Sequence, residues 1–444
     1  MLKEDGGNRH NSRMLGLDFG TTNSAVGLAR DDGTSRLASF GEPGRQSATF
    51  RSVLHFSALE RKPSVRPQPT AGPWAIDSYR DEGAGGRFLQ SLKSHLASRH
   101  LSETYVFGWK FTLEDLVALI LTELRRVARD QLGDPGSHVL LGRPVHFAAG
   151  PEGHVDVEGD ARALARLEAA ARQAGFTEVA FEFEPVAAAY EYERSLDHDE
   201  LVLIGDFGGG TSDFCLVRLG PGARAAGDRS SSILGIDGVP IAGGAFDGRI
   251  VRAVVAPRLG LGSMRRSEHG KMLPVPAWIY SRLERWEDVS FLATPATFET
   301  LKQLRFQAVE PSKIDSLIRL VEDDLGYLLY EAVERTKLEL SARDATQFEF
   351  RELPRRIVQQ VTQAEFELWL ASDLERLAGC VDRLLARCGV AAGDVDRVFL
   401  TGGSSLVPSV RRLFTERFGA ARLRGGEELT TVARGLALIA ASRA

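Results

Sequence analysis

The sequence predicts an α/β fold built from two related halves. Four apolar runs rich in Val, Ile and Leu are typical of buried strands, and each ends near Gly, Asp or Pro: residues 14–20, 138–144, 201–208 and 396–403. Longer segments with helical periodicity lie between and before them: residues 113–132, 161–176, 325–340 and 365–389. Strands that alternate with longer helices favour helices layered on a sheet. The third observation is a pattern that occurs near the start of each half.

This duplicated pattern is a strand, an Asp-Phe-Gly triplet, a Gly/Thr turn and a second apolar strand. It reads LGLDFGTTNSAVGLA at 15–29 and LIGDFGGGTSDFCLV at 203–217. Three consecutive glycines, 208–210, weaken a buried strand, so something must approach the bare backbone closely there. We interpret each copy as a β-hairpin, one in each half.

Turn and loop residues delimit the other elements. Gly175 and Gly389 follow helical segments, where a left-handed C-cap is expected. Two segments look irregular, because 60–87 is rich in Pro and Gly and 220–245 in Gly, Ser and Ala. Residues 255–312 have no strong period and are interpreted as an insertion.

The composition is that of an ordinary folded chain of 444 residues, with 43% hydrophobic and 26% charged residues. A net charge of −5 gives no reason to expect nucleic acid or an anionic membrane as a partner. Three cysteines without metal-site spacing favour a reducing, cytoplasmic location over a disulfide framework or a zinc site. Residues 1–13 are polar and are interpreted as a disordered leader. No stretch approaches the ~20 apolar residues that cross a bilayer.

The two hairpin turns are suited to binding a polyphosphate. A tight turn whose N–H groups point into one concavity binds anions, and glycine and threonine allow close approach and add hydroxyl donors. Asp18 and Asp206, which precede the turns, can face a phosphate only through a divalent cation such as Mg²⁺. One copy alone could be a hairpin with an exposed Asp, whereas two copies in matching halves favour a two-sided grip.

Other familiar motifs do not fit the sequence. No G-x-x-x-x-G-K-[ST] follows a strand, no G-x-G-x-x-G opens a helix after the first strand, and no H-E-x-x-H occurs. P-loop enzymes and dinucleotide-binding folds are therefore disfavoured.

The hairpins resemble the two phosphate motifs of the actin-like ATPase superfamily, which also includes hexokinase-type sugar kinases. EPVAAAYEY (184–192) is similar to the first connecting motif of the 70-kDa heat-shock chaperones. VFLTGGSSLVPSVRRLF (398–414) is similar to their adenosine motif, and AVERTKLELS (332–341) resembles their ribose- and adenine-contacting helix. The matches run in family order from residue 14 to the C-terminus. GRPVHF and EPVAAAYEYE resemble the stand-alone, YegD-like branch in particular.

The resemblance implies an α/β actin-like ATPase fold of two lobes. Each lobe would contain a mixed sheet of duplicated ribonuclease-H-like topology flanked by helices, with the nucleotide in the cleft between them. Lobe I would span 14–200, with an inserted subdomain at about 41–137. Lobe II would span 201–444, with an inserted subdomain at about 251–345, and a C-terminal helix at about 430–444 would pack back on lobe I.

The resemblance also implies roles for individual residues. Asp18 and Asp206 would hold Mg²⁺ through water. The catalytic set would be Lys93, Glu184, Thr211 and Asp206, with Lys93 reaching the γ-phosphate and the attacking water. The nucleotide-binding set would include Thr211 and these residues: Thr21, Thr22, Asn23, Gly208, Gly209, Gly210, Asp213, Gly243, Gly244, Glu334, Lys337, Leu338, Ser341, Gly402, Gly403, Ser404 and Leu406.

Simpler interpretations of some of these residues stay open. Lys93 could be a surface lysine, and Glu184 before a proline could be an acid favoured at a helix start. Glu334 and Lys337 could form a solvated ion pair, although with Ser341 their i, i+3 and i+7 spacing places them on one helix face.

The sequence departs from the chaperone pattern in three places. Leu338 and Leu406 stand where the chaperones commonly place two arginines around the adenine, so weaker or less selective base binding is expected. Gly244 and Ala245 replace two acids in the glycine-rich loop. The sequence stops at Ala444 without the apolar linker and β-sandwich that bind peptides, so peptide binding by the usual route is not expected.

The sequence therefore predicts a chaperone-related protein that binds ATP or ADP with Mg²⁺ and hydrolyses ATP slowly as its lobes close. A protein client or a co-chaperone would be its partner. Two alternatives keep the fold: a small-metabolite kinase, which needs a carboxylate base such as Asp206 or Asp213 beside an acceptor pocket, and an actin-like filament protein.

Overall fold

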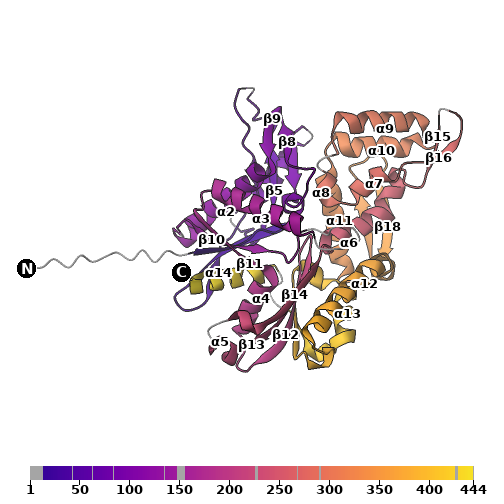
Figure 1. Ribbon diagram of the computed structural model, residues 1–444. Helices are drawn as coiled ribbons and strands as arrows, with labels where there is room; N and C mark the ends of the chain where they lie inside the picture. The colour runs from indigo at the N-terminus through magenta and orange to yellow at the C-terminus, as the bar shows by residue number, and fades with distance from the viewer. Residues whose placement is uncertain are drawn as a thin grey trace, which may run out of the picture.

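The computed structural model describes residues 14–443 except positions 43, 63, 84, 135, 148–155, 226–228, 268, 290, 291 and 426–428. Helices and mixed sheets alternate along the chain (Figure 1), so the predicted α/β class is confirmed. The expected disordered leader, residues 1–13, lies outside the described residues.

The first sheet has the N-terminal hairpin at its centre. Its path is β11 (Glu178–Phe183), β10 (His138–Arg143), β1 (Met14–Asp18), β2 (Asn23–Ala29) and β3 (Ser35–Leu37). The β1–β2 and β2–β3 pairs are antiparallel, whereas β1–β10 and β10–β11 are parallel. A short strand, β4 (Phe50–Arg51), also pairs with β2.

The second sheet repeats this order with the second hairpin at its centre. Its path is β14 (Ile233–Val239), β13 (Ser212–Leu219), β12 (Glu200–Phe207), β19 (Arg397–Thr401) and β20 (Leu423–Gly425). The β12–β13 and β13–β14 pairs are antiparallel, whereas β12–β19 and β19–β20 are parallel. The two sheets therefore share one topology, and in each the first strand runs directly into a Gly/Thr turn.

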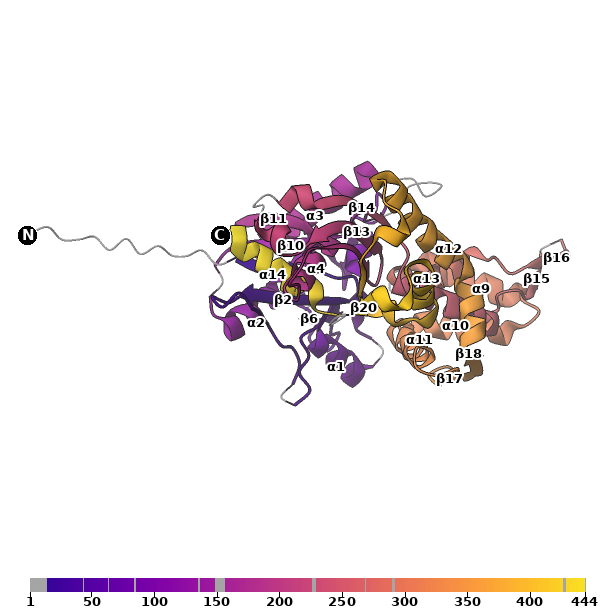
Figure 2. The same cartoon turned by 90° about the horizontal axis from the view of Figure 1, so that it is seen from below.

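Two helices lie between the sheets. α4 (Glu184–Glu193) contacts β12 and β13, and α14 (Thr431–Arg443) contacts β1, β2 and α4. Figure 1 shows the two helices between the sheets, and they lie side by side in both views (Figures 1 and 2). The approach is close, because a Cβ at Gly435 would lie 1.8 Å from the carbonyl oxygen of Ala187. Small residues on α4 and α14 therefore allow the sheets to pack near one another.

The outer faces of the sheets are covered by long amphipathic helices. α2 (Leu113–Leu132) and α3 (Val157–Gln173) cover the first sheet, and α12 (Gln363–Cys388) and α13 (Pro408–Phe418) cover the second. β12 is buried at every position, which explains its continuous apolar run. Gly175 and Gly389 have φ angles of 89° and 66°, so the left-handed helix ends predicted there are confirmed.

Each half carries a further group of small elements. In the first half these are β5 (Val53–Phe56), β6 (Thr70–Ala71), α1 (Pro73–Glu82), β7 (Arg87–Gln90), β8 (Glu103–Val106) and β9 (Trp109–Thr112). In the second half they are β15 (Met264–Arg266), β16 (Met272–Pro274), α7 (Trp278–Leu283), α8 (Trp286–Val289), α9 (Pro295–Gln307), α10 (Pro311–Glu322), α11 (Gly326–Leu340), β17 (Ala345–Phe350) and β18 (Ile357–Thr362).

These two groups touch through aromatic side chains. The rings of Tyr79 and Phe88 lie 5.6 and 4.7 Å from the ring of Tyr327, and the hydroxyl of Tyr79 donates to the carbonyl oxygen of Asp324 at 2.7 Å. Arg80 also forms an ion pair with Glu331 on α11. The two halves therefore meet both at α4 and α14 and at this second, outer contact.

Two segments are more regular than their composition predicts. α1 lies within 60–87, and β14 lies within 220–245, where α6 (Gly243–Ile250) also begins. Proline is tolerated in the first helical turn, where its missing N–H needs no partner, so Pro73 begins α1 rather than breaking it. The prediction of irregular structure was wrong at both places, because a high content of glycine and proline does not exclude short helices and strands.

In the parts of the chain that the structure describes, no helix is long and apolar enough to cross a membrane.

Candidate functional site

A cleft of about 820 Å³ lies where the two halves meet. It is lined by both hairpin turns and by parts of α6 and α11. All of the sequence-predicted site residues line it except Asp213 and Ser341. The structure therefore brings together residues that are separated by up to several hundred positions in the sequence.

The two hairpin turns face each other directly across this cleft. A Cβ at Gly209 would lie 2.5 Å from Thr22 Oγ1, and one at Gly210 would lie 3.0 Å from Thr21 Oγ1 and 3.7 Å from Ser94 Oγ. Glycine is therefore required in the second turn because the hydroxyl groups of the first half approach its backbone. Three hydroxyl groups and a bare peptide backbone converge at one place, which is a composition suited to an anion.

The second turn is held from behind by its own half. Gly208 N donates to the carbonyl oxygen of Thr211 at 3.0 Å, which closes the turn. The first N–H groups of α6, those of Gly243 and Gly244, donate to the carbonyl oxygens of Gly208 and Gly209 at 3.3 and 2.7 Å. Ser404 Oγ also donates to the carbonyl oxygen of Gly208, at 3.3 Å. The carbonyl side of the turn is thus fixed away from the facing hairpin.

Carboxyl groups cluster beneath the turns. Asp206 and Asp213 stand directly opposite each other on β12 and β13, and both side chains are buried. Burial, with the nearby charge of Glu184, raises the pKa of Asp213 to about 7 and the pKa of Asp206 well above its ordinary value. Asp18, at the end of β1, has its pKa raised to about 7 by the same two causes. The cluster holds more carboxyl groups than it can ionise freely.

Lys93 is the cation of this cluster. Its Nζ lies 2.6 Å from Oε1 of Glu184, and both side chains are 8% exposed. Burial lowers the pKa of Lys93, but the charges of Glu184 and Asp18 outweigh it, so the net shift is upward and the ammonium form persists. Lys93 is therefore not a surface lysine. Glu184 does begin α4, as the helix-start interpretation expects, and it lines the cleft as well.

The two aspartates that line the cleft fit a cation held through water. Among the described residues, no group of three or more His, Cys, Asp or Glu side chains is arranged to hold a metal ion directly. Asp18 and Asp206 both have raised pKa values, so a nearby cation would stabilise their ionised forms. Mg²⁺ keeps several waters and takes one or two carboxylates together with phosphate oxygens. The donor set therefore suits Mg²⁺ better than an ion that requires a complete protein cage.

The buried carboxyl groups give a pH prediction for the unliganded protein. A carboxyl whose folded-state pKa is raised from 3.8 to about 7 keeps its proton in the folded state after it has lost it in the unfolded state. The free energy of unfolding should therefore fall, by about 4 kcal/mol for one such group, as pH rises from about 4 to about 7. Asp213→Asn should reduce this fall, measured as the urea midpoint at pH 5 and pH 7.5. An unchanged pH dependence in the variant would contradict the prediction.

The α11 side of the cleft is lined by two ion pairs. Glu334 accepts from Arg51 Nη1 and Nη2 at 3.3 and 3.1 Å, and Lys337 Nζ lies 2.8 Å from Oδ1 of Asp247 on α6. Burial raises the pKa of Glu334, but the charges of Arg51 and Lys337 outweigh it and lower it overall. Glu334 and Lys337 therefore pair with residues of other elements rather than with each other, which differs from a solvated helix pair.

Three leucines give the cleft an apolar part. Leu338, Leu406 and Leu429 all line it, and they are 56%, 39% and 50% exposed. Ser341 does not line the cleft, because its Oγ donates to the carbonyl oxygen of Lys337 at 3.0 Å at the end of α11. A flat apolar group bound here would meet aliphatic side chains.

Asp213 does not line the cleft, although its cross-strand neighbour Asp206 does. Its Oδ1 accepts from the N–H of Val145 at 2.7 Å, and it is 1% exposed. Asp213 stays a predicted site residue: it leaves the same face of the sheet as its cross-strand neighbour Asp206, which does line the cleft, and the N–H of Val145 in the first half holds it. Its charge can still act on the neighbouring carboxyl groups.

Sequence reasoning missed several residues of the cleft. Asp247 lies three residues after Gly244 of the glycine-rich loop, and Ser94 is adjacent to Lys93, so both could have been found from these motifs. Arg51 follows an irregular segment and Leu429 precedes α14, and neither belongs to a motif. They are brought to the cleft by tertiary packing alone.

Comparison with protein families gives one finding. A family model described as Hsp70 protein matches residues 309–443. The matched region contains α11 with Glu334 and Lys337 and the turn at 402–406, whereas both hairpin turns lie outside it. Over these residues the chain is similar to Hsp70 proteins, and the match supports its resemblance to the Hsp70 family.

Proposed function

We propose that the chain binds ATP with Mg²⁺ in the cleft between its two halves and hydrolyses it slowly. The observation that carries the proposal is that two equivalent Gly/Thr turns face each other across the cleft above a cluster of carboxyl groups and one buried lysine. The Hsp70 match supports a chaperone-family ATP-binding protein. An actin-like arrangement of two lobes with the nucleotide between them accounts for the facing turns and for the Hsp70 match.

The residues of the cleft have separate tasks in this proposal. Backbone N–H groups and hydroxyl groups of the two turns bind the phosphates, and Lys93 neutralises charge on the terminal phosphate. Mg²⁺, when bound, supplies further charge neutralisation and orients the phosphate oxygens. Glu184 orients water, and its contact with Lys93 holds the ammonium group at the cleft wall. Phosphoryl transfer to water requires mainly such positioning and electrostatic stabilisation.

The contacts between the halves suit a nucleotide-controlled switch. Arg51 and Arg80 of the first half form ion pairs with Glu334 and Glu331 on α11. The hydroxyl of Tyr79 donates a hydrogen bond to the carbonyl oxygen of Asp324, just before that helix. A nucleotide that contacts both turns favours closure, and its hydrolysis removes part of that preference. The state of the cleft would then be read by a protein client or a co-chaperone.

Phosphate release tests the proposal. The purified chain with ATP and Mg²⁺ should release phosphate more slowly than the median enzyme rate of about 10 per second. Asp18→Ala, Glu184→Ala and Thr211→Ala should each lower this rate at least about tenfold. Unaltered turnover in all three variants would reject the site. ATP binding without hydrolysis in the wild-type chain would instead indicate a nucleotide sensor.

Base selectivity gives a second prediction for the same site. With Leu338 and Leu406 lining the cleft and Ser341 outside it, we expect ATP and GTP to bind within about tenfold of each other. The Leu338→Arg, Leu406→Arg double variant should bind ATP more tightly, because each guanidinium stacked on adenine contributes ~0.5–2 kcal/mol. Calorimetric titration with both nucleotides measures this. Equal ATP affinity in the wild-type and doubly substituted chains would count against the expectation.

A further inference from the structure

Lys93 lies in a short loop whose shape does not follow from its own sequence. The loop contains a 3-10 turn at Leu92–His95, and Ser91 before it has a φ of 56°, a left-handed conformation that is unfavourable for residues other than glycine. Ser91 is buried, and its hydroxyl has no hydrogen-bond partner among the described residues. Contacts from outside the loop must therefore hold it.

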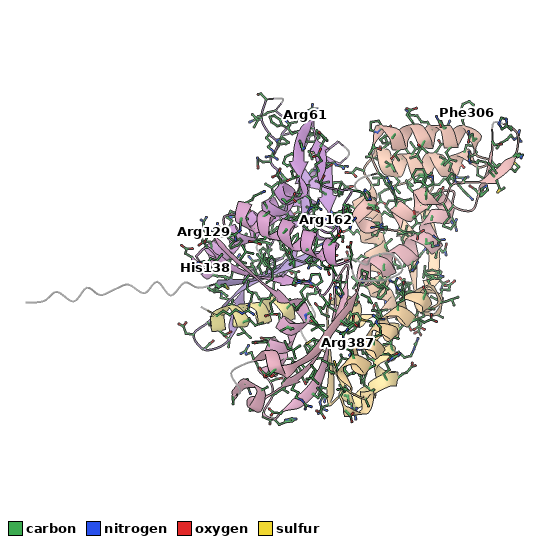
Figure 3. The ribbon with its side chains drawn as sticks, viewed as in Figure 1. Arg61, Arg129, His138, Arg162, Phe306 and Arg387 are labelled. Carbon is green, nitrogen blue, oxygen red and sulfur yellow. The ribbon has the colours of Figure 1, made fainter. Side chains whose placement is uncertain are left out.

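Two arginines on α3 supply these contacts. The carbonyl groups of residues 95–98 all accept hydrogen bonds from these arginines. Arg166 Nη1 donates to three of them at 3.4, 3.0 and 2.9 Å, and Arg162 Nε donates to the fourth at 3.1 Å. Figure 3 labels Arg162, whose side chain comes from α3 near the middle of the molecule. Carbonyl groups at the end of a helical turn attract cationic donors, so these bonds are favourable and directional.

Arg166 is itself held in place. Its Nε lies 3.2 Å from Oε1 of Glu114 in the first turn of α2, and the two side chains are 13% and 22% exposed. A continuous set of contacts therefore leads from α2 through Glu114 and Arg166 to the loop, and from the loop through Lys93 to Glu184. The rigid helices of the first half thus determine where the ammonium group of Lys93 lies.

We propose that Arg166, supported by Arg162, is a positioning residue that holds Lys93 at the wall of the cleft. The effect of Arg166 on catalysis rests on the proposed function, whereas its effect on the position of Lys93 does not. Because a displacement of about 1 Å in a reacting group can cost about a hundredfold in rate, a loosened loop lowers turnover more than it lowers nucleotide affinity.

Chemical labelling of Lys93 tests the placement without any nucleotide. In the full-length chain, mass spectrometry follows the reaction of lysine amines with an acylating reagent, and the pair with Glu184 protects Lys93. Arg166→Ala should speed labelling of Lys93 by roughly tenfold, because the loop opens more often. Lys337, which is 12% exposed and lies in the other half, is the internal control and should not change. Arg172→Ala, on the same helix but paired with Glu168, is the matched control variant.

Single-turnover hydrolysis tests the catalytic consequence. Arg166→Ala should lower the hydrolysis rate roughly tenfold and change the ATP dissociation constant less than about twofold. Arg166→Lys should recover only part of the rate, because an ammonium group cannot bond three carbonyl groups with fixed geometry. Adding Arg166→Ala to Lys93→Ala should not lower the hydrolysis rate further, because Arg166 acts on the rate through the ammonium group of Lys93.

The outcomes separate the two proposals. Labelling of Lys93 at the wild-type rate in Arg166→Ala overturns the positioning role, whatever the ATPase result. Equal acceleration at Lys93 and Lys337 also overturns it, because it indicates general loosening. If Arg166→Ala speeds labelling of Lys93 alone and the wild-type chain releases no phosphate, the proposed ATPase activity is rejected and the positioning role stands. If Arg166→Ala does not fold, Arg162→Ala, which removes one bond, should give a selective acceleration of about threefold.

Discussion

Lys93→Met should slow hydrolysis by about a hundredfold and destabilise the protein at the same time. Lys93 Nζ lies 2.6 Å from Glu184 Oε1 in a buried pair, so removal of the ammonium leaves a carboxylate without its cation. Breaking a buried pair in this way typically costs about 3 kcal/mol. The terminal phosphate would also lose its main side-chain cation, which should lower the hydrolysis rate by about a hundredfold. Urea unfolding and single-turnover hydrolysis measure the two effects.

A second substitution separates the two effects of Lys93. The Lys93→Met, Glu184→Gln double variant removes both charges, so its free energy of unfolding should return to within about 1 kcal/mol of the wild-type value. Hydrolysis should stay as low as in Lys93→Met. Lys302→Met is the control, because its pair with Glu299 is exposed and should contribute nothing measurable. A double variant as unstable as the single one would show that Glu184 is stabilised by other contacts.

Gly209→Val should weaken nucleotide binding strongly while leaving each half folded. The backbone of Gly209 lies outside the left-handed region, so valine causes no backbone strain there. Its Cβ would instead lie 2.5 Å from Thr22 Oγ1 and 3.4 Å from the Cβ atoms of Thr21 and Thr22. The facing turns must separate, and groups that contact one ligand from two sides lose their alignment. We expect ATP affinity to fall by about a hundredfold, as measured by calorimetric titration.

The control for this prediction is another glycine with free space. Gly393→Val should leave ATP affinity unchanged, because no heavy atom lies within 4 Å of a Cβ at that position. Wild-type affinity in Gly209→Val would show that the turns do not need their close approach. It would also remove the steric reason for the glycine triplet in the second hairpin.

The central strands and the hairpins were predictable because their patterns are local. β1, β10, β12 and β19 coincide with the four apolar runs, and α2 covers the segment with helical period at 113–132. Continuous burial on both faces produces such runs without any knowledge of partners. β14 was missed because two glycines interrupt its apolar pattern, and α1 because it begins at a proline in a segment rich in glycine.

The cleft was predictable only where motifs mark it. The hairpin turns, α11 and the turn at 402–404 could be named from sequence, and the structure brings them together around one cavity. Arg51 could not be found, since its pairing with Glu334 depends on how the two halves pack. The orientation of Asp213 toward Val145 also depends on the facing half, because the sequence alone does not show which residue lies opposite it. Contacts between distant segments are thus the part that sequence patterns do not contain.

The central claim is that one nucleotide is held from both sides by the two hairpin turns. Hydrogen exchange with and without ATP and Mg²⁺ tests it most directly, because it reports each turn separately. We predict slower exchange in peptides that cover 19–24 and in peptides that cover 207–212, with the protection lost when Mg²⁺ is chelated. Protection of one turn only, or of neither turn, would contradict the claim.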